Sequence, residues 1–213
     1  MNEIIQIEKI HKSFKSQQVL TDVSLSCKKG YIYGITGYNG SGKTVLFKCL
    51  CGFIKPDSGR ILVRGKELHK DFDMIENAGV IIEEPAFTAG FSGIRNLEML
   101  YLIHNKKNRT KLEAVMQQVG LDPALKKPVE KYSLGMRQRL AIAQAIMEDQ
   151  DILILDEPMN GLDKQGIADM RHLFMRLKSE GRTILFASHN KDDIDMLCDE
   201  VYEMEHGQLS RLR

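Results

Sequence analysis

The stretch that decides the fold reads Gly37-Tyr38-Asn39-Gly40-Ser41-Gly42-Lys43-Thr44. It fits the pattern G-x-x-x-x-G-K-[ST] and follows a strand-like run over residues 31–36. The glycines let the backbone turn tightly, so that successive N–H groups point inward at phosphate oxygens. A helix beginning near Lys43 adds the positive end of its dipole. In this pattern Lys43 reaches the β- and γ-phosphates of a nucleotide, and the Thr44 hydroxyl binds Mg²⁺. An ordinary glycine-rich turn is the alternative, which the flanking strand and helix disfavour.

Two carboxylates follow an apolar run further along the chain. The run Ile152-Leu153-Ile154-Leu155 ends in Asp156 and Glu157. Ligands of an α/β sheet gather at the carboxyl ends of its strands. Asp156 is therefore placed to hold Mg²⁺ through water, and Glu157 to polarise an attacking water. Without the phosphate loop, two acids at a strand end would more often form a solvated cap; with it, the metal and water roles are favoured.

Strand patterns and helix patterns alternate over most of the chain. Strands are expected at residues 4–7, 19–25, 61–63, 79–82, 152–155 and 183–187, with helices at 164–179 and 191–197. A closing hairpin is expected over residues 201–205 and 208–211, turning at His206-Gly207. Strands alternating with helices imply an α/β fold with a mostly parallel sheet. The fold class is thus a P-loop ATPase core preceded by an amino-terminal antiparallel β part.

A helical lobe is inserted into this core. From about residue 94 to residue 147 the apolar spacing is helical, with breaks at 105–108 and around 123–128. No long linker, low-complexity tract or internal repeat separates independent domains. We therefore expect a single ATP-binding domain over residues 1–213, with a core lobe at about 1–84 and 150–213 and a helical lobe at about 85–149.

Composition limits the possible partners. The chain has 213 residues, and its 30 Lys and Arg nearly balance its 29 Asp and Glu, so no nucleic acid partner is expected. No apolar run approaches the roughly 18 uncharged residues of a membrane-spanning helix, and the amino terminus lacks a signal-peptide pattern. The cysteines show neither metal-ligand nor CxxC spacing, which favours reduced, buried thiols in the cytosol; they are Cys27, Cys49, Cys51 and Cys198.

A further motif identifies a family. The segment Tyr132-Ser133-Leu134-Gly135-Met136-Arg137-Gln138-Arg139 lies after the phosphate loop and before Asp156. With these motifs the chain resembles, over essentially its whole length, the nucleotide-binding subunit of an ATP-binding cassette (ABC) transporter. That family carries a signature of roughly L-S-G-G-Q, of which Ser133 and Gly135 keep the two positions that matter most chemically. Ser133 is a natural N-cap for a helix over residues 134–147, whose free N–H groups and dipole can meet an anion. The resemblance implies that this anion is the γ-phosphate of ATP held by the opposite subunit; a plain capped helix is the alternative for the segment alone.

The resemblance implies roles for three more residues. Asp163, in Pro158-Met159-Asn160-Gly161-Leu162-Asp163, is similar to the D-loop aspartate that reaches across the dimer. His189 is similar to the switch histidine that contacts the γ-phosphate. Phe14 occupies the place of the aromatic residue that stacks on adenine, although a core anchor is the alternative. The remaining histidines have no such context and are interpreted as surface or core residues: His11, His69, His104, His172 and His206.

One position departs from the family. Where a Gln normally ends the strand before the helical lobe, this chain has Glu83. A carboxylate can ligate Mg²⁺ through oxygen more strongly than an amide can. It also adds negative charge beside a triphosphate. ATP affinity is therefore predicted to depend unusually steeply on Mg²⁺, and Glu83→Gln is the variant that tests this.

The expected partners are a second nucleotide-binding subunit, as a homodimer, and a membrane permease that docks on residues 85–104. In the implied cycle Glu157 orients water, while Lys43 and His189 stabilise developing charge. Through the permease the chain would lie at the cytoplasmic face of the membrane. Two segments, Ile82-Glu83-Glu84-Pro85-Ala86-Phe87 and the signature, resemble those of bacterial ATPases that serve bacitracin and lantibiotic exporters. Many of those continue beyond the equivalent of Arg213, so the absence of that tail leaves the cargo open.

Three competing functions remain. A soluble ABC-type ATPase of DNA repair or ribosomes would usually carry a long coiled coil, a duplicated cassette or a basic arm. A small P-loop kinase would share the Lys43 loop but would have no use for Ser133, Gly135 or His189. A degenerate subunit that only binds nucleotide is disfavoured by the intact Glu157 and Lys43.

Overall fold

The computed structural model describes residues 3–84 and 86–213; residues 1 and 2, and Pro85 at the start of the predicted permease-facing segment, lie outside it. The described strands are β1 (Glu3–Phe14), β2 (Gln17–Lys28), β3 (Ile32–Thr36), β4 (Ser58–Val63), β5 (Lys66–Glu67), β6 (Ala78–Ile81), β7 (Ile152–Asp156), β8 (Thr183–Ala187), β9 (Glu200–Glu205) and β10 (Gln208–Arg211). The helices are α1 (Lys43–Cys51), α2 (Gly93–Tyr101), α3 (Arg109–Gln118), α4 (Leu134–Ile146), α5 (Lys164–Ser179) and α6 (Lys191–Leu197), with a short 3₁₀ turn at Val129–Lys131.

The central sheet, within the described residues, has six strands in the order β10-β9-β3-β8-β7-β6. All neighbours in it run parallel except the hairpin pair β9 and β10. Strands β3, β7 and β6 therefore point the same way, and the segments that follow them emerge at one edge of the sheet. Those segments contain Lys43, Glu157 and Glu83, which places the predicted site residues together.

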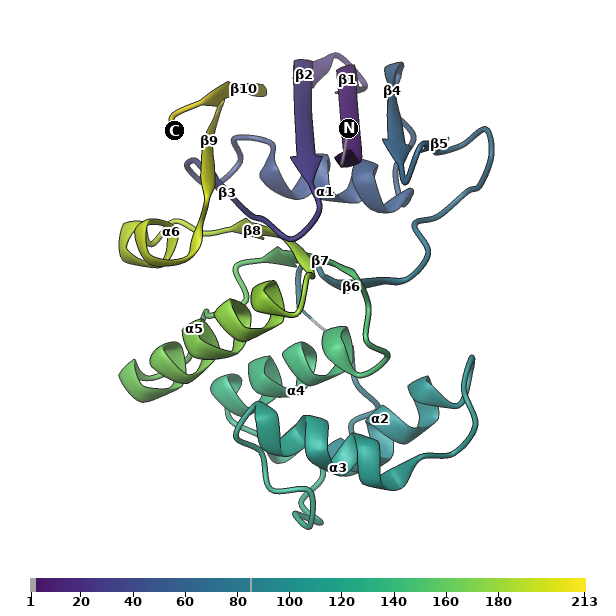
Figure 1. The fold of residues 1–213 in the computed structure, drawn as a ribbon, viewed down its shortest axis with the longest axis vertical. Helices are drawn as coiled ribbons and strands as arrows, with labels where there is room; N and C mark the ends of the chain where they lie inside the picture. Colours follow the sequence, from purple (N-terminus) through teal and green to yellow (C-terminus); the bar gives the residue numbers. More distant parts are fainter. Residues whose placement is uncertain (1–2, 85) are drawn as a thin grey trace.

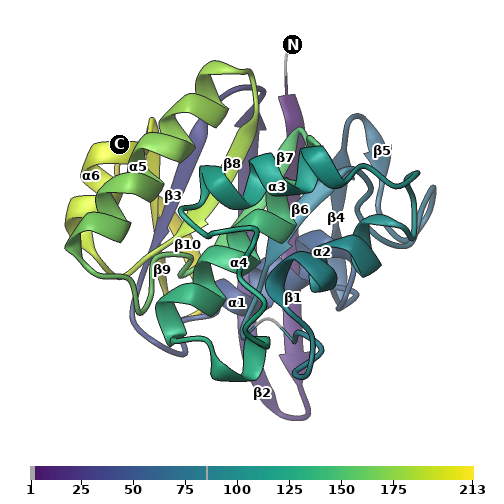
Figure 2. The same cartoon turned by 90° about the horizontal axis from the view of Figure 1, so that it is seen from below.

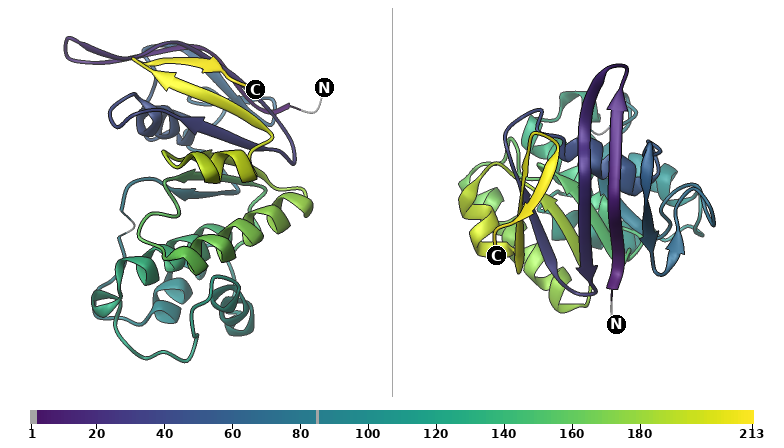
Figure 3. Two further views of the ribbon diagram at one scale, coloured as in Figure 1. Left: turned by 90° about the vertical axis from the view of Figure 1, so that its left-hand side faces the viewer. Right: turned by 90° about the horizontal axis from the view of Figure 1, so that it is seen from above.

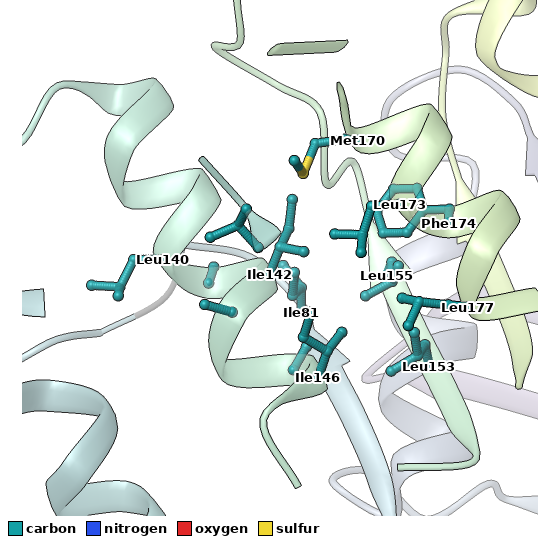
Figure 4. Close-up of a cluster of buried hydrophobic side chains, with 14 of the residues drawn as sticks. Ile81, Leu140, Ile142, Ile146, Leu153, Leu155, Met170, Leu173, Phe174 and Leu177 are labelled. Atoms are coloured by element: carbon teal, nitrogen blue, oxygen red, sulfur yellow. The ribbon is translucent and has the colours of Figure 1, made fainter. Parts of the chain in front are cut away.

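Strand β7 shows why its sequence is apolar without interruption. Alternate side chains point to opposite faces of a sheet. Ile152 and Ile154 belong to a core between the central sheet and the amino-terminal part, whereas Leu153 and Leu155 belong to a second core beneath it. Figure 4 shows Leu153 and Leu155 beside Leu177 and other side chains of α4 and α5. Both faces of β7 are thus buried, which fixes the position of the acids at its end.

An antiparallel sheet, ordered β2-β1-β4-β5, forms the other layer of the core lobe. Helix α1 runs between this layer and the central sheet (Figure 1) and buries Leu46, Phe47 and Leu50 in the core they share. The terminal hairpin of β9 and β10 lies beside β2 when the molecule is viewed from above (Figure 3), and Thr21 N–H donates to Gly207 O over 2.8 Å. Helix α1, which follows the phosphate loop, is therefore packed between the antiparallel sheet and the central sheet.

Helices α2, α3 and α4 form a lobe on the far side of the central sheet (Figures 1 and 2). Helix α4 joins this lobe to the sheet, because Ile142 and Ile146 share a buried core with Leu153 and Leu155. None of the helices in the described parts of the chain is long and apolar enough to span a membrane. All four cysteines are free and buried, as the sequence predicts.

The predicted α/β class, the antiparallel amino-terminal part and the inserted helices are confirmed. The strands β1 and β2 are longer than the predicted residues 4–7 and 19–25. The reason is that both continue as a hairpin into polar residues around Lys15 and Ser16, where apolar alternation no longer marks them. The two-residue strand β5 was missed because it is too short to show a pattern.

Candidate active site

The phosphate loop occupies the turn between β3 and α1. Gly37, its first residue, has φ 142°, and a Cβ built there would lie 2.3 Å from Met204 O in the terminal hairpin. Gly42, at the N-cap of α1, has φ 117°. Any larger side chain at Gly37 would push the hairpin off the loop, so glycine is required by both conformation and space. The helix begins at Lys43, as predicted from the sequence.

Lys43 is held over the loop by the loop's own carbonyls. Its side chain is largely buried, and Nζ donates to Gly37 O over 2.7 Å and to Tyr38 O over 3.0 Å. The neighbouring Ser41 Oγ is buried and has no hydrogen-bond partner within the described chain. A buried hydroxyl without a partner is costly, typically by about 1–3 kcal/mol. A phosphate oxygen would accept from both groups, so the loop fits an anionic ligand.

Asp156 and Thr44 meet beneath the loop. Thr44 Oγ1 donates to Asp156 Oδ2 over 2.5 Å. Burial raises the pKa of the Asp156 carboxyl, while the Thr44 hydrogen bond and the Lys43 charge act in the opposite direction. One hydroxyl oxygen and one carboxylate oxygen at the end of β7 are ligands of the kind that Mg²⁺ prefers. The predicted pair Thr44 and Asp156 is therefore brought together by the fold.

Glu157 and His189 form a second pair at the same sheet edge. Glu157 lies in the left-handed region with φ 50°, and its N–H donates to Ala187 O over 3.0 Å. Its carboxylate accepts from His189 N–H over 3.1 Å and lies 2.9 Å from His189 Nδ1. This turn of the backbone directs the Glu157 carboxylate toward the end of β8 rather than along β7. An acid and a histidine from two neighbouring strands thus share one hydrogen-bonded cluster.

These residues surround a cavity of about 690 Å³. Its lining combines the phosphate loop, the acids after β6 and β7, and the start of α4: Val19, Asn39, Gly40, Gly42, Lys43, Thr44, Val45, Glu83, Glu84, Leu134, Arg137, Gln138, Asp156, Glu157 and Asn160. Other predicted site residues lie outside this lining, namely Phe14, Gly37, Tyr38, Ser41, Ser133, Gly135, Asp163 and His189. A single chain therefore gathers the phosphate loop and the acids but not the whole predicted set.

The signature segment begins helix α4. Ser133 is its N-cap, and Ser133 Oγ accepts from Met136 N–H over 3.2 Å, as predicted. Leu134 is 49% exposed although it is apolar. A Cβ built on Gly135 would lie 2.9 Å from Gly161 O, in the segment that precedes α5. Asp163 caps α5 by accepting from Gly166 N–H over 2.9 Å. The signature and the predicted D-loop therefore touch each other within one chain.

Phe14 lies at the end of β1 and is 44% exposed, so it is not a core anchor. Lys12 Nζ is 5.5 Å from the centre of its ring and also pairs with Asp57 Oδ1 over 2.7 Å. Val19, on the partner strand β2, lines the cavity. The exposed aromatic face is thus available on the strand pair that borders the site.

Glu83 directly follows Ile82 at the end of β6, with φ 61°. Because β6 and β7 are parallel neighbours, Glu83 and Asp156 leave the sheet side by side and both line the cavity. The Glu83 carboxylate pairs with Lys48 Nζ over 2.6 Å.

Sequence reasoning missed one residue beside this site and one contact of the phosphate loop. Lys48 was not singled out, although it stands four residues after Thr44 on α1, a spacing that places both on one helix face. His206 was interpreted as a surface or core residue and is exposed, and its Nδ1 lies 2.9 Å from Tyr38 Oη of the phosphate loop. The helical spacing could have indicated Lys48. Nothing local could have indicated His206, because the contact spans 168 residues.

A phosphate loop between strand and helix, with acids at the neighbouring strand end, defines a P-loop nucleotide-binding ATPase of the α/β class. The ABC transporter family model matches residues 20–160, and the chain belongs to this family. It is an ATP-binding and ATP-hydrolysing subunit of that family.

Individual relatives agree with this assignment. The chain is 41% identical over 206 residues to the uncharacterized ABC transporter ATP-binding protein YybJ of Bacillus subtilis (strain 168), covering 97% of this chain and 94% of that protein. It is 38% identical over 211 residues to the bacitracin transport ATP-binding protein BcrA of Bacillus licheniformis, covering 98% and 69%. Among solved structures, cbiO1 from Clostridium perfringens, part of the ABC transporter complex cbiONQ, superposes with a TM-score of 0.84 at 27% identity, covering 99% and 88%.

Proposed function

We propose that this subunit powers a separate membrane permease, working as one of two facing copies, and that the permease exports a peptide antibiotic or another amphiphile. The observation that carries the first part is that one chain fixes Lys43 on its own phosphate loop, while the signature residues Ser133 and Gly135 lie outside the cavity lining, to which α4 contributes Leu134, Arg137 and Gln138. The similarity to BcrA, a bacitracin transport protein by name, supports the proposed cargo.

ATP is the proposed ligand of the cavity. Loop N–H groups from Gly37 to Thr44 and the Lys43 ammonium would hold its phosphates, and Phe14 would stack on its adenine. Mg²⁺ would be held by Thr44, Asp156 and Glu83 together with phosphate oxygens, because these side chains offer oxygen ligands at one sheet edge. When bound, the metal supplies charge neutralisation to the phosphates.

Glu157 is the proposed group that orients the attacking water. Its carboxylate is already fixed by the N–H of His189 and lies close to the His189 ring. Lys43 and His189 would stabilise the negative charge that develops on the transferred phosphoryl group. A bound nucleotide would compete with the loop carbonyls for Lys43 Nζ, which now contacts Gly37 O and Tyr38 O.

The second copy is proposed to supply the remaining contacts. The free N–H groups at the start of α4, next to exposed Leu134, would meet the γ-phosphate held by the partner. Asp163 would reach across the same interface. Bound ATP then favours the closed pair, because only the closed pair makes both sets of contacts.

The helical lobe is proposed to receive the permease. Several large apolar side chains on and around α2 are exposed, as expected for a surface that a partner covers: Phe91, Met99, Leu102 and Ile103. Through this partner, the subunit is proposed to lie at the cytoplasmic face of the membrane. We also propose the division into a core lobe at about residues 1–84 and 150–213 and a helical lobe at about 85–149.

The test starts from cells that carry the gene. A tagged chain purified from detergent-solubilised membranes is expected to bring down a polytopic permease. Deleting the gene is expected to raise sensitivity to bacitracin or a lantibiotic, and the parent but not Glu157→Gln should restore resistance. Recovery of the chain with ribosomes or DNA, and no change in sensitivity, would contradict the proposal and favour a soluble ABC-type ATPase.

A further inference from the structure

The Glu83 carboxylate has a partner on helix α1. Lys48 Nζ lies 2.6 Å from Glu83 Oε1. Lys48 stands on α1, the helix that follows the phosphate loop, one turn beyond Thr44 and on the same face. Thr44 reaches Asp156 after β7, and Lys48 reaches Glu83 after β6. One face of one helix therefore contacts the acids at two adjacent strand ends.

This pairing changes the charge of the site. Glu83 alone would add a negative charge beside the phosphates, but the Lys48 ammonium compensates it. The Glu83 side chain is 64% exposed, and exposed ion pairs of this kind are weak. A divalent cation can therefore displace the lysine from the carboxylate.

We propose that Lys48 is a positioning residue that competes with Mg²⁺ for the Glu83 carboxylate. The proposal rests on the proposed function, since it takes the cavity to bind ATP with Mg²⁺. Lys48 holds Glu83 in a compensated pair when the metal is absent, and metal binding has to break that pair. Glu83 predicts that ATP affinity depends steeply on Mg²⁺. Because Lys48 competes with the metal, this dependence is weaker in the parent than in a variant that lacks Lys48.

The experiment is a double-mutant cycle on the isolated chain. ATP affinity is measured by calorimetry in excess Mg²⁺ and in excess EDTA, at constant ionic strength, for the parent, Lys48→Met, Glu83→Gln and the double variant. The measured quantity is the ATP affinity in Mg²⁺ divided by the ATP affinity in EDTA. Lys48→Met is expected to raise this ratio in the parent background about three- to tenfold more than it does in the Glu83→Gln background. A coupling of this size is typical of residues in contact. Lys70→Met, which removes an exposed lysine paired with Glu67, is the matched control for charge and should leave the ratio unchanged.

Equal changes in the two backgrounds would overturn the proposal, because Lys48 would then act as a general positive charge and not through Glu83. Lys48→Arg keeps the cation and is expected to keep the parental ratio; a ratio like that of Lys48→Met would also contradict it. Lys48→Gln replaces Lys48→Met if circular dichroism shows that the latter is unfolded. Failure of the proposed function looks different, since the parent itself would then bind no ATP in either buffer.

Discussion

The phosphate side and the signature side of the molecule differ in what their polar groups contact. On the phosphate side, Lys43 contacts loop carbonyls, Thr44 contacts Asp156, and Glu157 contacts His189. On the signature side, the Ser133 side chain caps its own helix and the apolar Leu134 remains exposed. The first region is organised within one chain, whereas Ser133 and Gly135 of the second lie outside the cavity that the first region lines. The difference supports the proposal that a second copy completes the site.

The largest expected effect comes from removing the acid that is proposed to orient water on the phosphate side. Glu157→Gln is expected to bind ATP normally and to hydrolyse it about 10²–10⁴-fold more slowly, because general-base assistance is lost. It should accumulate as an ATP-dependent dimer, seen by gel filtration with light scattering. Glu180→Gln, at the exposed C-cap of α5, is the control and should hydrolyse ATP at the parental rate. A monomer in saturating Mg·ATP, or full activity, would contradict the comparison.

A mixing experiment can break the comparison directly. Lys43→Ala removes the phosphate side, and Gly135→Val places a side chain against Gly161 O on the signature side. Each variant alone is expected to lose hydrolysis by about 10²–10³-fold, the cost of removing one stabilising group at a transition state. Mixed, they can form a dimer with one intact site, in which Lys43 comes from one chain and the signature from the other.

ATPase activity of the mixture is the measurement. Partial recovery above both variants is expected if the site is shared between copies. If each chain owned a complete site, mixing would restore nothing. Mixing two preparations of Gly135→Val controls for dilution and for any activating effect of protein concentration.

The sequence predicted the helices and strands of the phosphate side, because their determinants are local. The glycines of the loop, the start of α1 at Lys43 and the apolar strand before Asp156 are each encoded within a few residues. The N-cap role of Ser133 was predicted for the same reason, since an N-cap bond spans three residues. Local rules therefore account for the elements and for the acids at their ends.

Contacts between distant segments could not be predicted in this way. The pairing of Lys48 with Glu83 spans 35 residues, and the contact of Tyr38 with His206 spans 168. Both depend on strand order, which places β6 at one edge of the central sheet and the β9–β10 hairpin at the other. The sequence pattern of one segment does not indicate the strand order. The pairs Lys48–Glu83 and Tyr38–His206 can therefore be identified only in the folded structure.

Removing the aromatic ring of Phe14 tests whether this residue binds the adenine base of ATP on the phosphate side. Phe14→Ala is expected to weaken ATP binding by about 1–3 kcal/mol, the value of stacking a base on an aromatic side chain. Phe14→Tyr keeps the stacking face and should bind like the parent. Inorganic tripolyphosphate, which has no base, should bind the parent and Phe14→Ala equally; a loss there would mean that Phe14 acts through the fold of β1.

The smallest effect is expected on the signature side, where Ser133 has two proposed tasks that different substitutions separate. Ser133→Ala removes the N-cap bond to Met136 N–H and should lower the free energy of unfolding by about 1 kcal/mol. Ser133→Asp restores a good cap but places a carboxylate where the partner's γ-phosphate is expected, so its thermal stability should match the parent while its ATP-dependent dimer is lost. Thermal melting and light scattering measure the two properties independently. If Ser133→Asp formed the dimer as readily as the parent, the helix N-terminus would be a structural cap alone, and the signature side would have no ligand in the partner.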